Sequence, residues 1–125
     1  MSIQSYQLSL LKIPVSNLET AAQFYEHDLG LTLEFLVEEY GWAQFSAGTL
    51  PLALYLPGKG GGDGQIGGSL DFHLSLAASD FDPLADRLLA AGVLVEDMMH
   101  TGADGSTFID VRDPDGNVLK ISRRA

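Results

Sequence analysis

The sequence contains no cysteine, so neither a disulfide nor a thiolate metal ligand is available to it. No apolar run approaches the roughly 20 residues that span a bilayer, and the opening MSIQSYQLSL lacks the basic start of a secretory signal. Basic residues are also scarce, with 7 Lys and Arg against 17 Asp and Glu. Nucleic acids bind clustered Lys and Arg. These absences favour a cytoplasmic protein with neither a membrane nor a nucleic-acid partner.

The acidic balance has two interpretations. A formal net charge of −10 would attract cationic ligands to the protein. The simpler interpretation, which we favour, is that the charge keeps a cytoplasmic protein in solution. The 125 residues are enough for one domain with a real core.

An internal repeat organises the chain. NLETAAQFYEHDLGL, from Asn17, and DFDPLADRLLAAGVL, from Asp80, both place apolar residues at helical spacing along one face. A Ser with an acid three residues later predicts a capping box at each start, and Gly30 and Gly92 suit the left-handed residue after each end. The same helix is therefore predicted twice.

Strand-like segments surround both helices in the same order. YQLSLLKI precedes the first helix and LTLEFLVE, WAQFSA and LALYL follow it; LDFHLSLA precedes the second, and VLVEDMM, STFIDVR and NVLKIS follow. We therefore expect one domain with module one at residues 1–57 and module two at residues 70–125. Residues 58–69, rich in glycine, are expected to form a flexible linker. The turn DPDG lacks the acid spacing of a calcium loop.

The two βαβββ halves, the entry VSNLETAAQFYEHDLGL and the exit RDPDGNVLKI together resemble the vicinal oxygen chelate superfamily. That superfamily contains glyoxalase I, extradiol dioxygenases, and fosfomycin- and bleomycin-resistance proteins. The resemblance implies an α+β fold in which two tandem βαβββ modules form a cup-shaped, curved mixed sheet. It also implies a homodimer, since a second subunit commonly completes the cup.

Enzymes of this superfamily hold a divalent metal with four ligands, and the resemblance places those four positions on Leu10, Ala53, His73 and Lys120. Leucine and alanine offer a metal no donor, and one imidazole is too few for a zinc or iron site. An ammonium about 4 Å from a dication costs on the order of 8 kcal/mol at an effective dielectric near 20. No metal site and no cofactor are therefore expected, although Asp71, on the face of His73, is a possible displaced ligand.

Strand alternation then sorts the side chains of the expected cup. An apolar cavity with a few convergent polar groups is typical of a small-molecule site. The alternative for His73 is a hydrogen-bonded, half-buried histidine with no ligand. The residues expected to line a ligand pocket are Leu8, Leu10, Ala53, Tyr55, Asp71, His73, Ser75, Lys120 and Ser122.

These observations favour a metal-free protein that binds a small molecule, rather than an enzyme, and a drug-like or cationic compound is the candidate ligand. One alternative is a metal-dependent lyase, isomerase or dioxygenase of the same superfamily that uses His73 with displaced acidic ligands. A second alternative is a dimeric interaction module that has no ligand.

Overall fold

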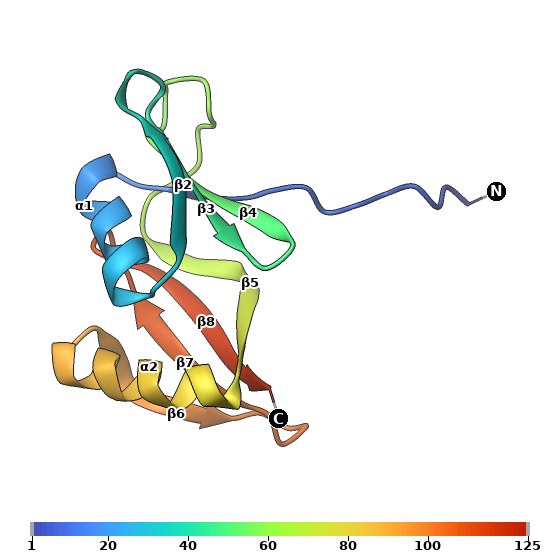
Figure 1. Cartoon of the computed structure of the whole chain (residues 1–125), viewed down its shortest axis with the longest axis vertical. Helices are drawn as coiled ribbons and strands as arrows, with labels where there is room; N and C mark the ends of the chain where they lie inside the picture. The colour runs from blue at the N-terminus through green and yellow to red at the C-terminus, as the bar shows by residue number, and fades with distance from the viewer. Residues whose placement is uncertain (1, 125) are drawn as a thin grey trace.

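The computed structural model contains two βαβββ modules and describes residues 2–124, leaving out the side chains of residues 94–99. Figure 1 shows the modules one above the other. Module one contains β1 (Leu11–Pro14), α1 (Leu18–Gln23), η1 (Phe24–Asp28), β2 (Thr32–Val37), η2 (Glu38–Tyr40), β3 (Trp42–Ala47) and β4 (Leu50–Tyr55). Module two contains β5 (Gly68–Ala77), α2 (Ala78–Ala91), β6 (Leu94–Thr101), β7 (Thr107–Arg112) and β8 (Asn117–Arg124). No helix among the described residues is long and apolar enough to cross a membrane.

The strands of each module form one four-stranded mixed sheet. The strand order is β1-β4-β3-β2 in sheet one and β5-β8-β7-β6 in sheet two. In both sheets the first strand runs parallel to the last, and the other neighbours are antiparallel. The first strand of each module is therefore an edge strand, and the repeat seen in the sequence is a repeat of topology.

The repeated helical face is the core of each module. All eight apolar positions that the pattern predicted are buried: Leu18, Ala21, Ala22, Tyr25, Phe81, Leu84, Ala85 and Leu88. The predicted left-handed glycines are confirmed too, with φ of +76° at Gly30 and +72° at Gly92. The first helix widens into a π-helical turn, η1, where the Leu29 N–H donates to the Phe24 carbonyl five residues earlier.

The predicted capping boxes are wrong at both helices. Asn17, not Ser16, is the N-cap of α1, and its side-chain oxygen accepts from the Thr20 N–H at 3.0 Å. The helix α2 begins at Ala78, after an N-cap residue, Ala77, that has no side-chain oxygen. Both serines were one or two residues away from the cap position, and Ser16 instead bonds the Asp115 carboxylate.

The turn DPDG, predicted only as a turn, is a buried polar junction between the modules. Asp113 is 4% exposed, and its carboxylate accepts from the Tyr25 hydroxyl at 2.7 Å and from the Asn117 amide at 2.9 Å. The same Asn117 amide donates to the Pro14 carbonyl of β1 at 2.9 Å. A buried carboxylate is tolerated where its oxygens are hydrogen-bonded, and here the bonds come from both modules.

Tyr25 is the module-one side of this junction. Its side chain is fully buried, and burial raises the pKa of its phenol above the ordinary value, helped by the negative charge of Asp113. The phenol therefore stays protonated and can donate to the carboxylate.

The first strand is shorter than predicted. It begins at Leu11 instead of Tyr6, and residues 2–10 form an exposed, extended arm that leaves the body of the molecule (Figure 1). The partner strand β4 begins at Leu50, directly after a turn, so it offers few residues for a longer parallel pairing. In module two, β8 is longer, and β5 extends over ten residues.

Candidate functional site

The face of sheet two that points away from α2 carries polar side chains, as alternation predicted. Along β5 the exposed residues are Asp71, His73 and Ser75, and the residues between them pack against the core. In the parallel pairing with β8, His73 lies opposite Lys120 and Ser75 lies opposite Ser122. The structure therefore brings four predicted pocket residues together on two neighbouring strands, with Asp71 further along β5, where the register is irregular.

A half-buried carboxylate organises the charges on this face. Asp110, on β7, accepts from the Lys120 ammonium at 2.8 Å, and its other oxygen lies 3.2 Å from the His100 imidazole. The side chain of Asp110 is 17% exposed. Phe108 lies beside both basic side chains, with its ring stacked 5.0 Å from that of His100 and 4.8 Å from the Lys120 nitrogen. Carboxylate and aromatic ring together stabilise the ammonium in place.

The sequence analysis missed this cluster, although a signal for it was present. Strand alternation in STFIDVR puts Phe108 and Asp110 on one face and the buried Ile109 and Val111 on the other. His100 lies near the end of β6, opposite Phe108.

The four positions that the resemblance assigns to metal ligands do not fit a divalent metal. Lys120 holds an ammonium beside His73 and already neutralises Asp110. Ala53 is fully buried and has no donor atom, and Leu10 lies in the arm before β1. Among the described residues, no group of three His, Asp or Glu side chains lies close enough to hold a metal ion. The donor chemistry of this site therefore provides no metal centre.

Module one differs because the glycine-rich segment lies over its sheet. The Lys12 ammonium donates to the Gly61 carbonyl at 2.6 Å, and the Gly64 N–H donates to the Tyr55 hydroxyl at 3.0 Å. A Cβ on Gly64 would lie 2.5 Å from that hydroxyl, so glycine is what allows the approach. These contacts place the segment over the sheet of module one, as a strap.

The strap changes the position of two predicted pocket residues. Tyr55 is 5% exposed and Ala53 is fully buried, and neither is among the residues that line the cavity between the modules described below. Alternation had correctly put them on the face away from α1, but composition alone could not show that the strap covers that face. The expectation that both residues line the pocket is corrected here.

Leu8 and Leu10 are also displaced from the predicted pocket. Both lie in the exposed arm, with 77% of Leu8 and 36% of Leu10 accessible to solvent. The parallel pairing of β1 with β4 begins at Leu11, so both residues precede it, and the residue opposite Ala53 is Lys12.

A cavity of about 410 Å³ lies between the two modules and includes His73 and Ser75 in its wall. One side is formed by the edge strand β5, and the other by Leu11, the connection into β2 and the β3–β4 turn. Arg124, at the end of β8, supplies a guanidinium. The volume and the mostly apolar lining are those of a small-molecule site.

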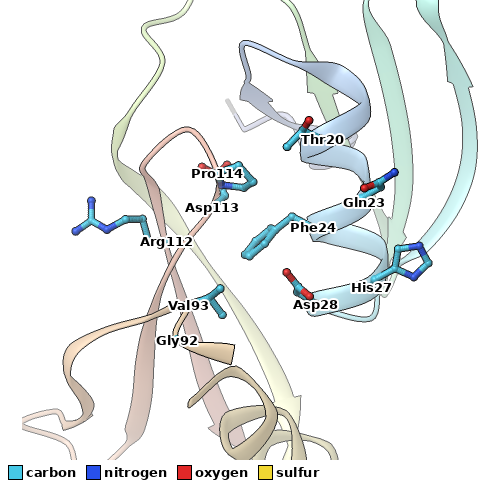
Figure 2. Close-up of a pocket in the computed structure, with 10 residues that line it drawn as sticks. All are labelled: Thr20, Gln23, Phe24, His27, Asp28, Gly92, Val93, Arg112, Asp113 and Pro114. Atoms are coloured by element: carbon cyan, nitrogen blue, oxygen red, sulfur yellow. The ribbon is translucent and has the colours of Figure 1, made fainter. Parts of the chain in front are cut away.

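A second, open groove of about 530 Å³ lies on the helical side of the molecule (Figure 2). Phe24 projects from the helix toward the space beside the β7–β8 turn, whereas Arg112 and His27 project away from it in opposite directions. The carboxylate of Asp113 in its wall is already bonded within the junction. The wall of this groove also contains the polar side chains of Thr20, Gln23 and Asp28.

Comparisons with known proteins place this architecture in one superfamily. The family model described as the Glyoxalase/Bleomycin resistance protein/Dioxygenase superfamily matches residues 7–121. A search of the curated proteins finds no significant match.

Three solved structures illustrate the likeness. Lactoylglutathione lyase from Agrobacterium tumefaciens is 20% identical with a TM-score of 0.77, over 94% of this chain and 92% of that one. A superfamily member from Sphaerobacter thermophilus is 24% identical with a TM-score of 0.77, over 95% and 98%. A virulence protein from Salmonella typhimurium is 26% identical with a TM-score of 0.64, over 100% of both chains. The first two show the fold alone. Because the family model covers nearly the whole sequence, the chain belongs to the Glyoxalase/Bleomycin resistance protein/Dioxygenase superfamily.

Proposed function

We propose that the chain binds a small organic molecule, without a metal, in the cavity between its two modules. The observation that carries the proposal is the cavity itself, which combines leucine side chains with His73, Ser75 and Arg124. Apolar walls with a few polar groups bind and orient ligands of this size. A module that only contacted other proteins would not require such a hollow.

The donor set supports binding without a metal. The Lys120 ammonium, fixed by Asp110 and by the ring of Phe108, lies next to His73 in the sheet. A divalent ion at His73 would have to be placed close to this positive charge. Catalysis by the family's metal chemistry is therefore not part of the proposal.

The test combines two measurements on the purified full-length chain. Elemental analysis of protein prepared without added metal should find no stoichiometric divalent metal. A thermal-shift screen of a diverse library, covering anionic, neutral and cationic compounds, should find ligands that raise the melting temperature, because binding to the folded state stabilises it.

Each result has an opposite that overturns the proposal. About one metal per chain would favour the lyase, isomerase or dioxygenase alternative, with His73 and displaced acids as ligands. A diverse screen that yields no ligand, from a chain shown to be folded, would favour the interaction-module alternative.

A further inference from the structure

The ionisable side chains that line the intermodule cavity are those of an arginine and a histidine. The chain carries 17 acids and 7 Lys and Arg, yet the cavity wall contains a guanidinium, from Arg124, and an imidazole, from His73, with no carboxylate. A cationic ligand would find no ion-pair partner among the described residues that line this cavity. The general acidity of the chain therefore does not extend to this wall.

Arg124 is bonded differently from the other cations nearby. Its Nη1 donates to the Ser75 carbonyl at 3.0 Å and to the Ser75 hydroxyl at 2.8 Å, and both acceptors are neutral. In contrast, the Asp82 carboxylate holds Arg123 at 3.0 Å and the Asp110 carboxylate holds Lys120 at 2.8 Å. Among the described residues, Arg124 thus keeps a positive charge that no carboxylate neutralises.

The two Ser75 contacts hold the Arg124 guanidinium at the cavity. A guanidinium has five N–H donors, so Nε and Nη2 remain for a ligand once Nη1 is used. Their fork geometry suits a carboxylate, which can accept two parallel hydrogen bonds. The edge strand β5 adds its outward-facing backbone groups to the same wall.

The rest of the wall is mostly apolar, although Thr32, Ser46 and Thr49 add hydroxyl groups. The larger apolar side chains that line it are Leu11, Leu29, Leu31, Leu50, Leu74, Leu76, Leu84 and Ile121. A ligand that matches both parts has an aliphatic or aromatic body and one anionic end. We propose that the cavity takes a small apolar carboxylate, with its carboxylate on Arg124 and its body against the leucines; this inference rests on the proposed small-molecule function.

Three probes with the same eight-carbon chain separate the possibilities: octanoate, 1-octanol and octylamine. At neutral pH and about 0.15 M salt, long-range repulsion from the acidic surface is screened beyond roughly 8 Å. We expect calorimetric titration to give octanoate an affinity at least tenfold above that of octylamine, with octanol between them.

Two neighbouring arginines provide a matched pair of variants. Arg124→Gln should lower the affinity for octanoate at least tenfold and leave the affinity for octanol within about twofold of its original value, because only the charged contact is lost. Arg123→Gln, which removes a guanidinium held outside the cavity by Asp82, should leave all three probes unchanged.

The possible failures are distinguishable from failure of the proposed function. Tighter binding of octylamine would overturn the carboxylate inference while supporting small-molecule binding. Octanoate binding that survives Arg124→Gln, or falls equally with Arg123→Gln, would overturn the assigned contact. Absence of binding by all three probes would overturn the inference, and the broader library screen would then decide the proposed function separately.

Discussion

Replacing Tyr25 with phenylalanine tests the buried junction between the modules. The hydroxyl of Tyr25 donates to Asp113 at 2.7 Å, and both side chains are almost fully buried. A hydrogen bond to a charged group contributes about 1.5–3 kcal/mol. The carboxylate keeps its other donors, from Asn117 and the Asp115 N–H. We therefore expect Tyr25→Phe to lower the free energy of unfolding by about 2 kcal/mol.

The same pair predicts a particular pH dependence. The pKa of Tyr25 is raised in the folded protein, whereas in the unfolded chain it is about 10. A raised pKa contributes stability that is complete below pH 10 and is lost as the pH rises above it. The difference in the free energy of unfolding between the natural chain and Tyr25→Phe should thus decrease above pH 10, by about 1.4 kcal/mol at pH 11.

Urea unfolding at pH 8, 10 and 11 measures both effects. With a slope of about 2 kcal/mol per molar urea, the loss at pH 8 corresponds to a midpoint lower by about 1 M. Tyr40→Phe is the control, because Tyr40 is 65% exposed and its hydroxyl should contribute little. If Tyr25→Phe is no more damaging than the control, or if its deficit does not shrink above pH 10, the junction does not work as described.

Three further predictions concern other parts of the molecule. His73→Ala should lower the free energy of unfolding by about 1 kcal/mol or less, because the side chain is exposed. Leu88→Ala, in the core, should lower it by roughly 2–5 kcal/mol. Equal losses in chemical denaturation would make His73 a structural residue. Gly64→Ala should lower the free energy of unfolding by about 1–3 kcal/mol, because the added methyl group clashes with the Tyr55 hydroxyl. Adding Tyr55→Phe should recover part of this loss, and a double-mutant cycle measures the coupling. Finally, we expect a two-fold symmetric dimer, because the arm exposes apolar side chains and both sheets have open edge strands. Sedimentation that shows only a monomer at micromolar concentration would contradict this.

The sequence predicted the architecture because its signals are local and repeated. The local signals were the helical spacing that starts at Leu18 and Phe81, the glycines Gly30 and Gly92, and the alternation along β5. Each of these signals depends only on residues a few positions away. Such signals survive without knowledge of the tertiary structure. They also placed His73 and Lys120 on one face, and the register confirms that pairing.

The remaining features depend on contacts between distant segments. Composition describes the strap as flexible, and only its path over Tyr55 shows why the glycines are there. The role of Asp113 needs Tyr25, far away in the chain, to be brought beside it. Likewise, the cavity exists only where β5 faces module one, so no pattern within either module could reveal Arg124 as part of it.

The strap has a consequence for stoichiometry. A chain built from two copies of one module would be expected to offer two equivalent concave faces, and so two ligand positions. Glycines 61, 62 and 64 lie against the rings of module one instead, in contact with Trp42 and Tyr55. The duplicated halves are thereby made unequal, because the strap covers a face of module one whose counterpart in module two leaves Asp71, His73 and Ser75 exposed.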